Sequence, residues 1–284
     1  MQLDGTDRKL LNLVQTGFPL SKEPYADLGQ RLGTDPNEVI RRIQQLKRRG
    51  IIRLIGPVLD SRSLGYQTTL VATRVAETNL EKAEKVIAEH PGVGHGYERG
   101  HYFNVWFTLA VPPAVNIETE LERLSHLAGA ETAFSLPVIK VFKIGAYFDM
   151  DEESQSASVP YQNSTLAKQV KLSPIEKLII NELQRDLPLI STPFTAMAEQ
   201  AGMDVERFLA QCRSLQQRGI IWRFSASINH NHAGFMANAM SCWVAPPQLI
   251  DVAGHKLASL KEVCLLYTSP SPRDLSTSRM PSSA

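Results

Sequence analysis

The feature that most restricts how this chain can fold is a repeat of its own sequence at a constant spacing. The run Arg49–Ile52 returns as Arg218–Ile221, and the match needs no gap between Pro19 and Gly65. The other matched pairs are Pro19 with Pro188, Pro24 with Pro193, Gly33 with Gly202, Leu46 with Leu215, and Gly65 with Gly234. Because similarity at a fixed spacing is typical of repeated structural units, we expect two similar modules in tandem.

The first module begins with the pattern of a winged helix-turn-helix. Apolar residues at helical spacing predict helices over 7–15 and 25–32, and a capping residue followed by Pro36 predicts a third helix that runs to Arg49. Gly50 should end that helix in the left-handed conformation, which glycine adopts without strain. The alternating stretch 51–59 predicts the wing strand or strands.

After Gly65 the pattern changes to that of a ferredoxin-like βαββαβ domain. Alternating apolar residues predict its strands, and apolar residues at helical spacing predict its helices. The expected strands are 67–75, 92–99, 103–111 and 135–142, and the expected helices are 79–89 and 116–127. The fold class is therefore α+β, a tandem of two modules that each combine a winged helix-turn-helix with a βαββαβ domain.

The second module repeats this plan but is expected to be truncated. Residues 236–244 should be the first strand of its βαββαβ domain, left as an unpaired edge because most later strands are missing. The expected domains, in chain order, are a winged helix-turn-helix at 1–60, a βαββαβ domain at 61–150, a polar linker at 151–171, a second winged helix-turn-helix at 172–235, the start of a second βαββαβ domain at 236–263, and an unrelated tail at 264–284.

The tail from Cys264 to Ala284 is predicted to be foreign to the protein. Its residues resemble the translation of a transposase-type sequencing adapter, and a flexible tail rich in serine and proline is the alternative. The natural chain would then be cut short after Val263, and the tail would take no part in the fold.

A cluster of polar and aromatic side chains lies in the first βαββαβ domain. It consists of His95, Tyr97, Arg99 and His101. Because the members are two residues apart, an extended chain would place them on one face, unless a glycine between them bends it. Such a face could donate a proton and hold an anion. Surface histidines without a chemical role are the alternative, and a zinc site is poorly supported because Glu98 is the one other ligand nearby.

The order His-x-Tyr-x-Arg-x-His-x-x-Asn-x-Trp-Phe-Thr, from His95 to Thr108, resembles the signature of the siroheme decarboxylases. These are Lrp/AsnC-like proteins of haem d1 and alternative haem biosynthesis, and Lrp/AsnC proteins also join a winged helix to a βαββαβ domain. A fused pair of unlike modules is similar to the D-L type of this family, whereas other members are pairs of separate subunits. Within the motif, Asn104 and Trp106 are expected to be structural.

The resemblance implies an enzyme, a carboxy-lyase that removes carbon dioxide from the two acetate side chains on rings C and D of siroheme. His95 and His101 are the expected acid pair, with the assignment between them open, because the pKa of histidine lies near neutrality. Arg99 should bind a substrate carboxylate bidentately, and Tyr97 and Arg53 are further candidates for that role. No cofactor and no metal site are expected, since the iron belongs to the substrate and the macrocycle can accept electrons; axial ligation of that iron by one histidine stays an alternative.

A DNA-binding transcriptional regulator of the Lrp/AsnC type is the main alternative function. Residues 1–60 contain 10 basic and 7 acidic residues, and the basic ones along the third helix could contact phosphates. Residues 172–235 contain 6 of each, and Asp204 and Glu206 open the corresponding helix. Because a symmetric operator reader needs two competent halves, we do not expect DNA as a partner.

Charge and hydropathy exclude other classes of protein. The 30 basic and 29 acidic residues nearly cancel, so the chain as a whole is no strong binder of polyanions. No segment has the apolar length of a membrane span, and the N-terminus lacks the pattern of a signal peptide, so we expect a cytoplasmic protein without a membrane partner. The two modules are expected to form a pseudo-dimer, with a homodimer as an open alternative.

Overall fold

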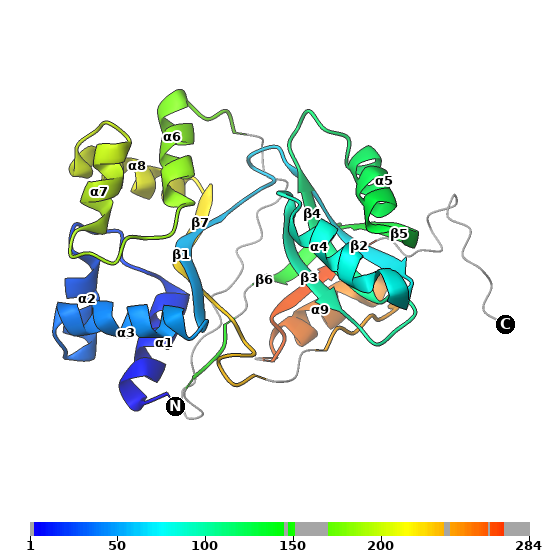
Figure 1. Ribbon diagram of the computed structural model, residues 1–284, viewed down its shortest axis with the longest axis horizontal. Helices are drawn as coiled ribbons and strands as arrows, with labels where there is room; N and C mark the ends of the chain where they lie inside the picture. Colours follow the sequence, from blue (N-terminus) through cyan, green and yellow to red (C-terminus); the bar gives the residue numbers. More distant parts are fainter. Residues whose placement is uncertain (1–2, 145–146, 151–169, 236–238, 261, 270–284) are drawn as a thin grey trace. The chain divides into compact units, whose positions relative to one another are not determined.

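The computed structural model describes residues 3–144, 147–150, 170–235, 239–260 and 262–269. These residues form two compact units (Figure 1). The helix unit contains the described residues up to Asp60, residues 147–150, and those from Lys171 to Cys242. The sheet unit contains Ser61–Ile144, residue 170, and the described residues from Trp243 onward.

Three helices open the helix unit, namely α1 Gly5–Thr16, α2 Pro24–Leu32 and α3 Pro36–Arg48. The Asp35 side chain caps α3 by accepting a hydrogen bond from the Asn37 amide, and Pro36 occupies the first turn, where no amide is needed. Gly50 follows with a φ of 69°, in the left-handed region that favours glycine. The predicted helices and the glycine that ends the third are confirmed, with bounds that differ by one or two residues.

The second half of the helix unit reproduces the repeat element by element. Its helices are α6 Pro174–Leu183, α7 Pro193–Gln200 and α8 Val205–Gln217. Each begins at the position that the spacing of the repeat gives for its counterpart in the first half. The buried positions coincide as well, since Leu10 and its counterpart Ile179 have no exposed surface, and neither do Tyr25 and its counterpart Phe194. The two modules therefore share one pattern of core positions.

The two modules are joined by their wing strands. β1 Ile52–Leu59 pairs in antiparallel fashion with β7 Ile221–Ile228, and the bounds of both strands correspond in the repeat. Gly56 lies opposite Ser225, its own counterpart in the repeat, so an approximate twofold axis passes through this pair. The predicted wing is thus one strand in each module, and each strand obtains its backbone hydrogen bonds from the other module.

The sheet unit contains the predicted βαββαβ arrangement. Its strands are β2 Gln67–Val75, β3 Val93–Glu98, β4 Val105–Val111 and β5 Ala130–Pro137, and its helices are α4 Leu80–Ala88, which follows the short helix η1 Glu77–Asn79, and α5 Ile117–Ala128. The antiparallel sheet has the order β3-β4-β2-β5, which is the ferredoxin-like order. One face of the sheet packs with both helices, and this core is Val71, Val75, Ala83, Ile87, Val105, Phe107, Leu109, Val111, Leu121, Leu124 and Ala128.

The last predicted strand, 135–142, is wrong in its extent. β5 begins at Ala130, directly after Gly129 ends α5 in the left-handed conformation, and it stops at Pro137. β6 Lys140–Ile144 is a separate strand, and it pairs with β8 Leu265–Thr268. Because proline has no backbone N–H to donate, Pro137 is a natural end to the pairing with β2.

The strand predicted at 236–244 is not observed in the part of that range that the structure describes. Residues 236–238 lie outside the described residues, and residues 239–246 form neither helix nor strand. Trp243 is 76% exposed, so its apolar ring gains little from burial. The chain continues as the short helix η2 Pro247–Leu249 and as α9 Ile250–Ala258. A matching position in the repeat is insufficient here, since a strand also needs a neighbour to pair with.

The predicted linker and tail are described only in part. Of the linker at 151–171, residues 151–169 lie outside the described residues, as do residues 270–284 of the tail. The first part of the tail forms β8 beside β6, so the expectation that the tail takes no part in the fold is wrong for these residues. The foreign origin of the tail stays a prediction, because a short segment with residues such as Tyr267 and Thr268, which favour strands, can pair with an available edge whatever its origin.

Candidate functional site

The residues predicted to carry the chemistry lie on the hairpin that joins β3 to β4, apart from Arg53. The register of this pair shifts between Val93 and Gly96, so β3 contains a bulge opposite Thr108. At the bulge, the backbone N–H of His95 donates to Thr108 Oγ1 at 3.1 Å. The imidazole of His95 is exposed. The bulge therefore fixes the backbone of His95 while its ring faces solvent.

Arg99 and His101 lie beyond the end of β3, which stops at Glu98. The Arg99 amide donates to the carbonyl of Asn104 at 2.8 Å, and the His101 amide donates to the carbonyl of Arg99 at 2.8 Å. The extended chain that would align the whole cluster on one face is therefore not observed, because a tight turn takes over from the strand. This turn sets the direction of His101, whose side chain is exposed.

Tyr97 and Arg99 form a stacked pair, with Arg99 Cζ 4.7 Å from the centroid of the Tyr97 ring. Tyr97 pairs across the hairpin with Trp106, so it lies on the face of the sheet opposite to the helix-packed core. An aromatic ring stacked on a guanidinium holds the plane of the guanidinium through the face of the ring and not through hydrogen bonds. The pair is therefore suited to present Arg99 to a planar anion such as a carboxylate.

Asn104 and Trp106 hold the turn in place, which confirms their predicted structural role. The Asn104 amide group exchanges two hydrogen bonds with the backbone of Val75, accepting at 2.9 Å and donating at 2.8 Å. The indole N–H of Trp106 donates to the carbonyl of Phe103 at 2.8 Å. Loss of the Asn104 side chain would leave the Val75 backbone groups without these partners. Because Asn104 and Val75 are both buried, this loss would be costly.

Two further residues that contact the hairpin were not predicted from the sequence. Thr108 binds the His95 amide, as described above, and Arg74 of β2 contacts Tyr102, the neighbour of His101. Arg74 lies 28 positions before Tyr102, so no local pattern links them. The sequence signal that could have identified Arg74 is strand alternation, which places it on the face of the sheet opposite to Val71 and Val75.

Arg53 belongs to the helix unit and not to the hairpin. It lies in β1 at a register shift between Ile52 and Leu54, and its side chain is exposed. Trp222, its counterpart in the repeat, lies at the matching register shift of the antiparallel pair. The bulges therefore follow the approximate twofold symmetry, but the side chains at them do not.

A polar clamp holds the beginning of the hairpin to α5. His90 Nε2 lies 2.8 Å from Glu120 Oε1, and His90 Nδ1 accepts a hydrogen bond from the Gly92 amide at 3.1 Å. Arg123 donates to the same carboxylate, with Nη2 at 2.6 Å from Glu120 Oε1. The hydrogen bonds from Arg123 and His90 lower the pKa of Glu120 to about 2. The carboxylate is therefore ionised at neutral pH and fixes the start of β3.

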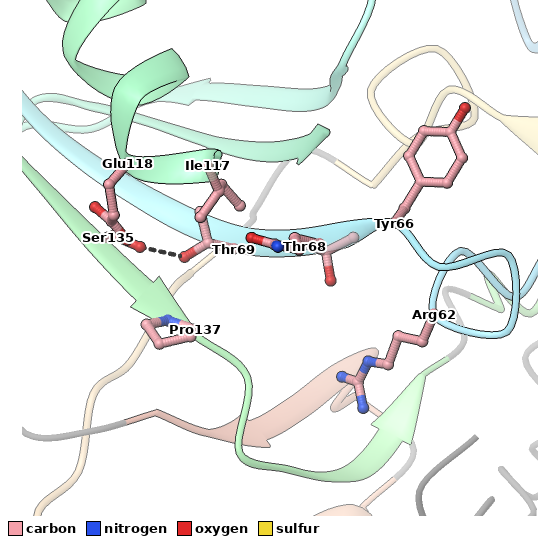
Figure 2. Close-up of a pocket in the computed structure, with 9 residues that line it drawn as sticks. Arg62, Tyr66, Thr68, Thr69, Ile117, Glu118, Ser135 and Pro137 are labelled. Atoms are coloured by element: carbon pink, nitrogen blue, oxygen red, sulfur yellow. Dashed lines mark hydrogen bonds between the residues drawn. The ribbon is translucent and has the colours of Figure 1, made fainter. Parts of the chain in front are cut away.

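A cavity of about 310 Å³ opens elsewhere in the sheet unit (Figure 2). Its lining residues are Arg62, Tyr66, Gln67, Thr68, Thr69, Ile117, Glu118, Ser135 and Pro137, and none of the predicted site residues is among them. Two of its hydroxyl groups already contact each other, since Thr69 Oγ1 lies 3.0 Å from Ser135 Oγ. Because the cavity contains none of the predicted site residues, we place the candidate site on the hairpin.

Comparison with known proteins defines the class first. A family model described as the AsnC-like ligand binding domain matches residues 63–143, and one described as the siroheme decarboxylase NirDL-like HTH domain matches residues 7–53 and 176–221. The chain is therefore a tandem Lrp/AsnC-like protein, as its fold predicts.

Relatives over most of the chain then define the family. The siroheme decarboxylase of Hydrogenobacter thermophilus is 36% identical, over 91% of this chain and 77% of that protein. The alpha subunit of the Desulfovibrio desulfuricans siroheme decarboxylase is 42% identical, over 54% of this chain and 87% of the subunit. A crystal structure of the siroheme decarboxylase NirDL in complex with an iron-uroporphyrin III analogue is similar with a TM-score of 0.67 and 31% identity, over 95% of this chain and 78% of that one. This chain belongs to the siroheme decarboxylase family.

Proposed function

We propose that this chain decarboxylates siroheme, as a carboxy-lyase that converts its two ring C and ring D acetate side chains to methyl groups and gives didecarboxysiroheme. The observation that supports this most strongly is one hairpin that bears two exposed histidines and, between them, a guanidinium stacked on a tyrosine ring. Such a hairpin offers a proton and an anion site within a few residues. A substrate with carboxylates on a flat macrocycle needs both.

In the proposed reaction, the bond between an acetate methylene and its carboxylate breaks and carbon dioxide leaves. The electron pair passes into the macrocycle, and an imidazolium delivers a proton to the methylene carbon. His95 and His101 are the proposed acids, because histidine can carry that proton near neutral pH. Arg99 binds a carboxylate of the substrate, Tyr97 holds Arg99 in place, and Arg53 of the helix unit is proposed as a further anion contact.

No cofactor and no metal site of the protein's own are needed in this proposal. The iron belongs to the siroheme substrate, and the conjugated macrocycle accepts the electrons that decarboxylation releases. Among the described residues, no three His, Cys, Asp or Glu side chains gather in a way that could hold a metal ion. The protein's part is to orient the substrate, to exclude water and to supply the proton.

The ion pairs on the basic face of α3 argue against the alternative function of a transcriptional regulator. Three of its cations lie in ion pairs: Arg41 with Glu38 at 2.5 Å, Arg42 with Asp4 and Asp7 at 2.7 Å each, and Lys47 with Asp186 at 2.5 Å. Cations held by carboxylates release fewer counterions on binding DNA, so they add less to affinity for phosphates. The α3 surface therefore supports DNA binding less than its sequence indicates.

The proposed partners are the siroheme substrate and a second copy of the fold. The two modules form a pseudo-dimer in this proposal, and the pairing of β1 with β7 about an approximate twofold axis supports it. A homodimer of whole chains stays an alternative. We propose a cytoplasmic location and no membrane partner. The helices of the described ranges include none that is long and apolar enough to cross a lipid bilayer.

Anaerobic incubation of the protein with siroheme, followed by mass spectrometry, tests the proposed function. We expect a product that has lost the mass of two carbon dioxide molecules. Unchanged siroheme, together with tight and salt-sensitive binding to a specific promoter, would contradict the decarboxylase and favour the regulator.

A further inference from the structure

The turn that carries His101 is attached to β2 through Arg74. Arg74 Nη1 donates to the carbonyl of Tyr102 at 3.3 Å, and Arg74 Cζ lies 5.3 Å from the centroid of the Tyr102 ring. On its other side, Arg74 Nε lies 3.6 Å from a carboxylate oxygen of Glu131 in β5. Arg74 thus ties the residue after His101 to two strands of the sheet.

Three successive carbonyls of this turn each accept a hydrogen bond. The carbonyl of Tyr102 accepts from Arg74, that of Phe103 from the indole of Trp106, and that of Asn104 from the backbone of Arg99. Arg74 is the donor for the carbonyl nearest to His101. Its removal would therefore loosen the turn at the position that bears the proposed acid.

Aromatic contacts also connect the turn to β5. The rings of Tyr102 and Phe103 meet edge to face at 5.0 Å, and Phe103 meets Phe134 of β5 at 5.1 Å. Tyr102 is nevertheless 51% exposed, so burial alone holds it weakly. The guanidinium of Arg74 supplies a directional contact where burial is incomplete.

We propose that Arg74 is a positioning residue that fixes the direction from which His101 donates its proton to siroheme. The inference rests on the proposed function and adds to it a residue outside the motif. Arg74 is already engaged by a carbonyl, a ring and a carboxylate, which suits it to hold the turn more than to bind a substrate carboxylate. Because small displacements of a catalytic group reduce the rate strongly, the effect should appear in kcat.

Arg74→Met tests this role, since methionine keeps much of the apolar stem but neither the charge nor the donors. We expect kcat for siroheme decarboxylation to fall by about tenfold to a hundredfold while KM changes by less than about twofold. Arg74→Lys should recover part of the lost kcat, because an ammonium can still donate to the Tyr102 carbonyl and pair with Glu131. Lys82→Met, an exposed cation on α4, is the matched control and should leave kcat unchanged.

Amide hydrogen exchange without siroheme tests the turn separately from the reaction. In Arg74→Met, the amides of Arg99 and His101 should exchange faster than in the wild type, because both donate hydrogen bonds inside the turn. Unchanged exchange with unchanged kcat, or a rise in KM alone, would overturn the role of Arg74 while leaving the decarboxylase intact. A wild-type protein that leaves siroheme unreacted would instead overturn the proposed function, and this role with it.

Discussion

The two helix-turn-helix modules coincide in backbone and core but differ on the surface. Their helices begin at corresponding positions of the repeat, and their buried positions match even where the residues differ, as with Tyr25 and Phe194. The cations Arg41, Arg42 and Lys47 of α3 have the counterparts Ala210, Gln211 and Gln216 in α8. The comparison shows that turn glycines and core volume specify this fold, because the charged face of α3 can be replaced without changing the helices.

The segments that continue the two modules differ more than the modules themselves. The first module continues into a complete four-stranded sheet with the histidine hairpin, whereas the described residues after β7 add α9 and β8. The chemistry proposed for this chain therefore depends on one copy of the repeat. Substitutions at matching core positions test whether the two modules are packed alike. Substitutions at features found in one copy test what each feature adds to stability.

The largest expected effect concerns the shared core. Phe194 has no exposed surface and packs edge to face against Phe224 at 5.6 Å. We expect Phe194→Ala to lower the free energy of unfolding by about 3–5 kcal/mol, because it leaves a cavity the size of a ring. Denaturant titration measures this, with Ile190→Ala, an exposed residue of the same module, as the control. A loss below about 1 kcal/mol would show that the second module is not packed like the first.

A smaller effect is expected where the cores differ by one hydroxyl group. The Tyr25 hydroxyl donates to the carbonyl of Pro188 in the second module at 2.9 Å, and burial raises the pKa of this phenol. Tyr25→Phe gives the first module the residue type of the second and should lower the free energy of unfolding by about 1 kcal/mol. Tyr66→Phe, at an exposed tyrosine of the sheet unit, should change it by less. Equal changes would mean that the hydrogen bond between modules contributes nothing.

The smallest effect is expected at the clamp of the sheet unit. The pKa of Glu120 is lowered to about 2 by Arg123 and His90, so its stabilisation is complete above the ordinary glutamate pKa of 4.5 and is lost as the pH falls toward 2. Glu120→Gln should therefore reduce the acid dependence of amide exchange in β3. Glu122→Gln, at an exposed neighbour on α5, is the control. Identical pH profiles for the two variants would rule out the clamp.

The sequence predicted the helices of both modules and β2 well, because apolar periodicity, caps and the repeat all agree there. It failed at β5 and β6, where Pro137 ends one strand and the chain starts another that pairs with a distant segment. The repeat also misled at 239–244, the described part of the strand predicted at 236–244, since pairing depends on a neighbour that local sequence does not reveal. Strand length is a non-local property in each of these cases.

For the candidate site, the sequence predicted the hairpin and the structural role of Asn104 and Trp106. The predicted alignment of the two histidines on one face is not observed, because the bulge at His95 and the turn after Glu98 depend on pairing with β4, which the local sequence does not reveal. Arg74 was missed for the same reason, since it reaches the turn from β2. Local patterns find the chemical groups, and tertiary contacts decide their directions.

The most direct test of the central claim compares three histidine variants in anaerobic siroheme decarboxylation followed by mass spectrometry. We expect His101→Ala and His95→Ala each to lower kcat by about a hundredfold or more, because each removes a proposed proton donor. His126→Ala, at an exposed histidine of α5 in the same sheet unit, should retain the wild-type rate. If both hairpin variants released two carbon dioxide molecules per siroheme at the rate of His126→Ala, the chemistry could not lie on this hairpin.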